Sequence, residues 1–204
     1  MAQSYDALVK RLRSLDPIIT ELLENSGSPG RSIGVLHHGK IVHTGHYGRR
    51  DISIPDPPND ETIYHIMSLT KPLAAAAIGL LVDEGHLNWD SRIHDILPVF
   101  KSRNDEIGQA ATLIDVLSNR TGFTAAHPYY AHRNEEIVLP KNEMTRMSCK
   151  IQAVKPFRQG FVYSSWNYAL ATDVIEKVSG KTFGAFVKET ILDPLNMQRT
   201  ISAI

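Results

Sequence analysis

The chain has 204 residues, enough for one domain with a substantial hydrophobic core. Its 22 Lys and Arg residues balance its 22 Asp and Glu residues, so the formal net charge is zero at pH 7. Proteins that bind nucleic acids or anionic membranes usually carry an excess of positive charge, which attracts the phosphate groups. This chain has no such excess, so we expect neither as a partner. A single cysteine, Cys149, excludes an internal disulfide and favours a reducing compartment.

The first predicted element is an amphipathic helix over residues 4–25, because leucines and isoleucines recur there at helical spacing. This segment lacks the uninterrupted apolar stretch of a signal peptide. The longest apolar run, residues 73–82, is too short to span a bilayer. We therefore expect a cytoplasmic protein.

A β-hairpin is predicted next, from two extended runs at residues 32–37 and 41–47 that flank a Gly-Lys turn. A loop that contains three prolines follows at 50–60. The chain then enters a helix over about 68–85 that is apolar on all sides, as a core helix is. Shorter helices are expected at 112–117, 167–179 and 183–191.

The core helix begins with Ser68-Leu69-Thr70-Lys71, and a serine and a lysine three residues apart lie on one face of a helix. Pro72 is tolerated only in the first turn, so both side chains must lie at the helix N-terminus. The helix dipole and the apolar surroundings disfavour an ammonium ion there, the condition under which a lysine can activate a serine hydroxyl. Taken alone, the spacing also fits a serine that caps the helix and a lysine that reaches solvent.

Further segments accompany this motif in a recognisable order. They are IMSLTKP at 66–72, LVDEGHLNWD at 81–90, LSNRTGF at 117–123, FVYSSWNYAL at 161–170 and PLNM at 194–197. The pattern resembles the serine β-lactamase and penicillin-binding protein superfamily, in particular its class C-like branch of esterases, D-alanyl carboxypeptidases and fungal acyltransferases. The resemblance covers nearly the whole chain and implies an α/β (α+β) fold with helices around an antiparallel sheet.

The resemblance implies catalytic roles for three residues: Ser68 as the acyl-accepting nucleophile, Lys71 as its proton partner and Tyr163 as a second base. A tyrosine is a poor base at its free pKa of about 10, but a nearby ammonium ion stabilises the phenolate. Either Tyr163 or Lys71 would take the proton from Ser68 and return it to the leaving group.

Residues that follow Tyr163 are the expected substrate contacts. Ser165 stands where the family has an asparagine, and a hydroxyl lacks the two-ended reach of an amide. Asn167 lies two residues further on, where a glycine is common, and Trp166 would either line an acyl or aromatic pocket or simply pack. Asn119 replaces a histidine that is frequent in its loop, and we expect that position to be structural.

Histidines invite a metal site, but the chain does not offer one at a suitable spacing. His43 and His46 point to opposite faces of a strand, and no cysteine or acidic residue joins them. We therefore expect no metal and no cofactor.

The family fold continues with β-strands beyond residue 197, and one of them carries a Lys-Thr-Gly or His-x-Gly element and a second oxyanion-hole N–H. We expect residues 1–204 to form a single β-lactamase-like domain, incomplete at its C-terminal end, that is either a fragment of a longer enzyme or a shortened relative. The predicted function is serine-dependent acyl transfer, with hydrolysis or transesterification of a small-molecule ester or acyl substrate. The alternatives are a truncated non-catalytic binding protein, or an isomerase or lyase with the same cluster. The sequence leaves the oligomeric state open.

Overall fold

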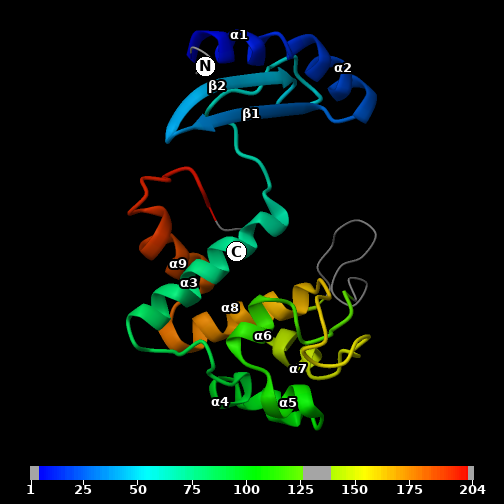
Figure 1. The fold of residues 1–204 in the computed structure, drawn as a ribbon, viewed down its shortest axis with the longest axis vertical. Helices are drawn as coiled ribbons and strands as arrows, with labels where there is room; N and C mark the ends of the chain where they lie inside the picture. The colour runs from blue at the N-terminus through cyan, green and yellow to red at the C-terminus, as the bar shows by residue number, and fades with distance from the viewer. Residues whose placement is uncertain (1–4, 126–138, 202–204) are drawn as a thin grey trace. The chain divides into compact units, whose positions relative to one another are not determined.

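A computed structural model describes residues 5–125 and 139–201 of the chain (Figure 1). Its contacts divide the chain into two units, with the boundary between His65 and Ile66. We refer to them as the N-terminal and the C-terminal unit, and the single domain expected over 1–204 stays a prediction. Within the described ranges, no helix combines the length and the apolar character needed to cross a bilayer.

The N-terminal unit is a β-hairpin packed against helices. It contains α1 (Tyr5–Arg13), α2 (Asp16–Ser26), β1 (Gly30–His37) and β2 (Lys40–Gly48). The strands pair antiparallel, and both helices contact β2. The predicted single helix is interrupted because Pro17, which lacks an N–H, lies in the first turn of α2 and begins a new helix there.

The hairpin turn follows from its residues. His38 and Gly39 both have positive φ, 47° and 74°, which matches the twist of a tight hairpin connection. Glycine adopts this conformation without a steric cost, and histidine is among the residues enriched there. The predicted hairpin is therefore present, with its turn one residue earlier than Gly39-Lys40.

The loop after the hairpin is fastened to it by side chains. Ser32 Oγ lies 2.8 Å from His46 Nδ1 and 2.8 Å from the hydroxyl of Tyr64, and His46 Nε2 lies 3.0 Å from Asp60 Oδ1. The acid that bonds His46 is thus far from it in sequence. Across the described residues, no group of three or more His, Cys, Asp and Glu side chains is arranged to hold a metal ion.

The C-terminal unit is helical, and its centre is the packing of α3 on α8. Its α-helices are α3 (Lys71–Asp83), α4 (Ile93–Ile96), α5 (Glu106–Ala110), α6 (Leu113–Leu117), α7 (Met144–Ser148), α8 (Ser165–Ser179) and α9 (Phe183–Val187). Buried residues of α3, among them Ala74, Ala77 and Ile78, and of α8, among them Leu170 and Ala171, belong to one core cluster. Alanines of both helices therefore contribute to this core.

The core helix differs from its prediction at the start. Residues Met67–Thr70 form a 3₁₀ turn, η1, and α3 itself begins at Lys71 with Pro72 in its first turn. Its end agrees with the sequence pattern, because Gly85 has a φ of 77° and donates its N–H to the carbonyl of Val82 at 3.0 Å. Likewise α8 ends before Gly180, which has a φ of 70°.

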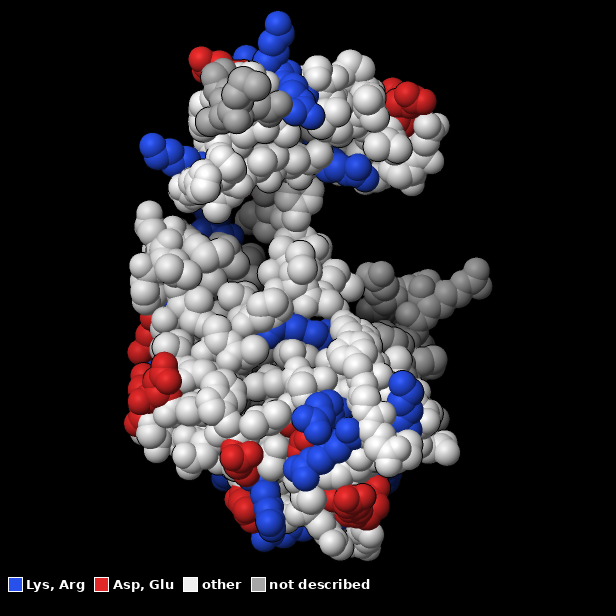
Figure 2. Space-filling model, in the orientation of Figure 1, with Lys and Arg blue, Asp and Glu red and all other residues white. Residues whose placement is uncertain are grey.

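Charged residues of both signs are interspersed over the visible face of the C-terminal unit (Figure 2). Oppositely charged side chains of this unit also pair, as Lys141 does with Glu176 and Lys181 with Glu189, both at 2.5 Å. This distribution accompanies the balanced composition and gives that face no dominant charge of one sign.

Candidate active site

Ser68 lies on η1, at the mouth of the core helix. Lys71 Nζ donates a hydrogen bond to Ser68 Oγ at 3.0 Å, and Ser68 Oγ shares a hydrogen bond of 2.6 Å with the hydroxyl of Tyr163. The three predicted catalytic side chains are therefore brought together within the C-terminal unit. The serine oxygen thus has a lysine donor on one side and a phenol oxygen that can accept its proton on the other, an arrangement that activates a nucleophile.

The residue before the nucleophile is held in an uncommon conformation. Met67 has a φ of 47°, in the left-handed region that few residues other than glycine, asparagine, aspartate and histidine adopt. Such strained positions concentrate at functional sites, where the surrounding structure has to hold them. The conformation of Met67 turns the chain from the preceding segment into η1, which carries Ser68.

Tyr163 is partly exposed, with a relative accessibility of 39%. The hydrogen bond with Lys71 lowers the pKa of Tyr163 most, the bond with Ser68 lowers it further, and burial opposes them. A smaller contribution in the lowering direction comes from a hydrogen bond with Ser165. These contacts therefore make the phenolate of Tyr163 more stable than that of a free tyrosine, which is the direction that a general base requires.

A second tyrosine, Tyr168, also faces the lysine. Lys71 Nζ lies 4.9 Å from the ring centroid of Tyr163 and 5.3 Å from that of Tyr168, so both rings offer cation–π contacts to the ammonium group. The Tyr168 hydroxyl donates to the carbonyl of Leu117 at 2.9 Å, and burial raises the pKa of Tyr168. Tyr168 therefore stays a neutral phenol that holds Lys71 in place.

Sequence reasoning did not single out Tyr168. The sequence feature that could have identified it is its position in the first turn of α8, five residues after Tyr163. A spacing of five residues places two side chains on different sides of an ideal helix. Tyr163 precedes the helix, however, and the extended backbone of Ser164 separates it from α8, so both rings approach Lys71.

Two of the expected substrate contacts lie in the core. Trp166 and Asn167 have no accessible surface. Asn167 Oδ1 accepts a hydrogen bond from Thr121 Oγ1 at 2.8 Å, and its Nδ2 donates to Asn119 Oδ1 at 3.0 Å. Neither side chain offers surface to a substrate in this structure, because the first turn of α8 turns both toward the core. Ser165, which is half-buried beside Tyr163, remains the accessible member of the set.

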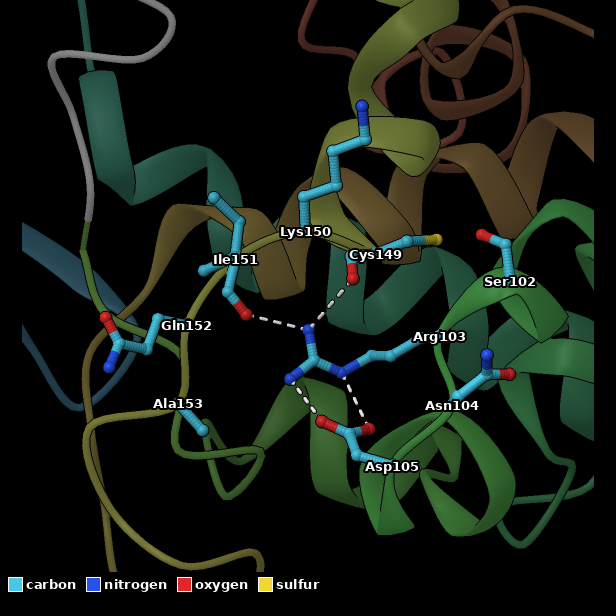
Figure 3. Close-up of a pocket in the computed structure, with 9 residues that line it drawn as sticks. All are labelled: Ser102, Arg103, Asn104, Asp105, Cys149, Lys150, Ile151, Gln152 and Ala153. Atoms are coloured by element: carbon cyan, nitrogen blue, oxygen red, sulfur yellow. Dashed lines mark hydrogen bonds and ion pairs between the residues drawn. The ribbon is translucent and has the colours of Figure 1, made fainter.

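A separate pocket lies around Arg103 (Figure 3). It has a volume of about 620 Å³ and is lined by residues 102–105 and 149–153. The guanidinium donates to the carbonyl of Ile151 at 2.7 Å, bonds Asp105 at 2.9 Å and stacks 4.7 Å from the ring centroid of Phe123. Figure 3 shows the guanidinium of Arg103 bonded to Asp105 on one side and to the carbonyls of Ile151 and Cys149 on the other. Its donors join the segment after α7 to the loop before α5, so we read this pocket as structural.

Cys149, the single cysteine of the chain, lines the same pocket. Its thiol donates weak hydrogen bonds to the carbonyls of Thr145 at 3.2 Å and Val99 at 3.5 Å. Because its thiol bonds two backbone carbonyls, we interpret Cys149 as a packing residue.

Comparison with known proteins identifies the family. Residues 15–202 match the family model described as Beta-lactamase, so the chain belongs to the Beta-lactamase family. Protein flp of Staphylococcus aureus is 26% identical to it over 191 residues, a region that covers 92% of this chain and 38% of flp. The unguisins hydrolase ungD' of Aspergillus campestris is 26% identical over 188 residues, 90% of this chain and 35% of that protein.

A solved structure is also similar. The octameric penicillin-binding protein homologue from Pyrococcus abyssi superimposes with a TM-score of 0.81 at 29% identity, over 91% of this chain and 43% of that one. The resemblance and the fold class predicted from the sequence are confirmed: the fold is β-lactamase-like, with helices and a two-stranded antiparallel sheet, and the described residues contain no further strand. The chain spans less than half the length of each of these relatives.

Proposed function

We propose that this chain carries the proton-transfer half of a serine acyl-transfer site, in which Ser68 forms an ester with the acyl group of a small-molecule substrate. The observation that supports the proposal most is the hydrogen-bonded row of Lys71, Ser68 and Tyr163, with distances of 3.0 and 2.6 Å. Membership of a family of serine hydrolases and acyltransferases supports the same reaction class.

In the first half-reaction, Tyr163 takes the proton from Ser68 while Oγ bonds to the substrate carbonyl carbon. The tetrahedral intermediate then collapses, the bond to the leaving group breaks, and the leaving group receives that proton from Tyr163. The shorter distance to Ser68 and the lowered pKa of Tyr163 favour the phenolate as base. Lys71, whose Nζ donates a hydrogen bond to Ser68 Oγ at 3.0 Å, is the third member of the proton-transfer row.

In the second half-reaction, Tyr163 activates the acceptor. Water yields hydrolysis, and an alcohol or amine yields acyl transfer; in both, the acceptor proton passes through Tyr163 to Ser68 as the ester bond breaks. The relative named as an unguisins hydrolase supports hydrolysis as one outcome. We propose the Ser165 hydroxyl as a contact to the substrate. We also propose that the protein acts in the cytoplasm, on a substrate that is present there.

The experiment is covalent labelling of the purified 204-residue chain with a fluorophosphonate probe, followed by intact mass measurement. We expect one probe adduct on the wild-type protein and none on Ser68→Ala. Ser102→Ala is the matched control, because Ser102 is an exposed serine of the same unit outside this cluster, and its labelling should equal that of the wild type. A nitrophenyl ester tests turnover with the same variants.

Labelling that persists in Ser68→Ala would exclude Ser68 as the nucleophile. A wild-type protein that forms no adduct with the probe or with activated esters, yet is stabilised by small-molecule esters, would instead support a non-catalytic binding protein. Conversion of a substrate without any adduct would support an isomerase or lyase.

A further inference from the structure

Asn119 bonds the residues on both sides of Tyr163. Its main-chain carbonyl accepts the N–H of Val162 at 3.0 Å, and its side-chain Oδ1 accepts the N–H of Ser164 at 3.0 Å. One residue thus holds the backbone immediately before and immediately after the phenol.

Asn119 is itself fixed in place. Its φ is 54°, in the left-handed region that asparagine adopts more readily than most residues, and its N–H donates to the carbonyl of Val116 at 3.1 Å, at the end of α6. Its relative accessibility is 4%. Asn167 Nδ2 also donates to Asn119 Oδ1, at 3.0 Å, so two donors converge on this oxygen and define the orientation of the amide.

The loop after Asn119 holds the same segment a second time. The buried hydroxyl of Ser164 donates to the carbonyl of Thr124 at 3.0 Å. Thr121 supports Asn167 through its bond to Oδ1, at 2.8 Å. The polar groups between the 117–124 loop and the start of α8 therefore form one buried network with Asn119 at its centre.

The phenol of Tyr163 has weaker fixation of its own. The side chain is partly exposed, and its polar partners are members of the reactive cluster: Ser68, Lys71 and Ser165. These contacts cannot orient the ring independently, because the proton transfer between Ser68 and Tyr163 changes the hydrogen bonds of the phenol during the reaction. The rigid part of the arrangement is the backbone on either side of the ring.

We propose that Asn119 is the positioning residue of Tyr163, which clamps Val162 and Ser164 so that the phenol oxygen meets Ser68. The consequence for acyl transfer rests on the proposed function, whereas the clamp and its effect on Tyr163 do not. The role goes beyond structural support of the loop, because it acts on the proton-transfer group.

Asn119→Gly is the variant that tests the side chain alone. Glycine keeps the positive φ without strain and keeps the main-chain carbonyl that bonds Val162, but it removes the acceptor for Ser164. Asn196→Gly is the matched control: Asn196 has a φ of 56°, is exposed, and lies in the turn after α9, outside the network.

The readout is the titration of Tyr163, measured as phenolate absorbance and isolated by subtraction of the Tyr163→Phe protein. We expect the midpoint to move to higher pH in Asn119→Gly, because the displaced phenol loses the hydrogen bonds with Lys71 and Ser68. The midpoint in Asn196→Gly should equal that of the wild type. Probe labelling of Ser68 should fall between about 10- and 100-fold in Asn119→Gly, the scale expected for a misplaced catalytic group.

A folded Asn119→Gly protein with the wild-type titration midpoint would overturn the clamp. If the variant does not fold, amide hydrogen exchange in the wild-type chain tests the clamp instead. Slow exchange of the Val162 and Ser164 amides supports the clamp, and exchange at the rate of an unstructured peptide overturns it. If the wild type fails to label while the titration midpoint still responds to Asn119→Gly, the proposed function fails and the clamp stands.

Discussion

The oxygens of Ser68 and Tyr163 lie 2.6 Å apart although the residues are 95 positions apart in the chain. Ser68 belongs to the turn before α3, and Tyr163 to the segment that precedes α8. The packing of these two helices therefore determines whether the serine has a base. Predictions about the site are consequently predictions about this contact and the groups that tune it.

The first prediction concerns the hydroxyl of Tyr163. Tyr163→Phe should lower probe labelling of Ser68 by about 100-fold or more, because general-base catalysis typically contributes on that scale. Its thermal unfolding should change little, since the side chain is partly exposed and packs mainly through its ring. Labelling rates at one pH, with circular dichroism melts, check both parts. Wild-type labelling in this variant would show that Lys71 alone is the base.

The second prediction concerns pH dependence and Lys71. Its hydrogen bond is the largest cause that lowers the pKa of Tyr163, so Lys71→Met should raise that pKa. An acid with a higher pKa loses its proton at higher pH, so the rise of labelling with pH should shift to more alkaline values. Lys177→Met, at an exposed lysine in the last turn of α8, should leave the profile unchanged. An unshifted pH profile in Lys71→Met would show that Lys71 does not lower the pKa of Tyr163.

The third prediction concerns stability in acid. Burial opposes the ionisation of Asp115, but hydrogen bonds from Arg158 and Thr112 outweigh burial and lower the pKa of Asp115 from its ordinary 3.8. The carboxylate therefore contributes stability that is complete above pH 3.8 and is lost as the pH falls through the lower folded pKa. Asp115→Asn should lower the free energy of unfolding by about 2 kcal/mol at neutral pH.

In the same variant, the difference from the wild type should shrink in acid, since the wild-type carboxylate is protonated there. Urea unfolding at neutral and at acidic pH measures both values. If the free energy of unfolding of Asp115→Asn differed from that of the wild type by the same amount at both pH values, ionisation of Asp115 would not contribute to stability.

The fourth prediction separates packing from substrate binding at Trp166. Trp166→Ala should lower the free energy of unfolding by about 3–5 kcal/mol, because the side chain is fully buried in the α3–α8 core. Trp89 is the matched control: it is 42% exposed, and Trp89→Ala should cost less than about 1 kcal/mol. A Trp166→Ala protein that keeps wild-type stability but loses affinity for ester substrates would contradict this prediction and indicate that Trp166 binds substrate.

Local features of the fold were predictable because their causes are local. Alternating residues around Gly39 predict the hairpin, and the apolar run before Gly85 predicts the core helix, since both depend on neighbours a few positions away. Errors occurred at element ends. The predicted N-terminal helix is divided at Pro17, and Ser68 lies in a 3₁₀ turn rather than in the helix.

The same division holds for the site. The sequence by itself determined that Ser68 and Lys71 meet, because helical geometry joins residues three apart and Pro72 restricts them to the helix start. It also determined the family, through the order of its motifs. The tertiary structure alone decided which side chains around Tyr163 reach the nucleophile and which enter the core.

Trp166 and Asn167 lie only three and four residues after Tyr163, yet they are buried, while Tyr168 and Asn119 flank the lysine and the base. Residue order cannot separate these outcomes, because the direction of each side chain depends on how α8 lies against α3 and the 117–124 loop. That arrangement arises from burial of apolar surface, which sums over the whole core and is encoded at no single position.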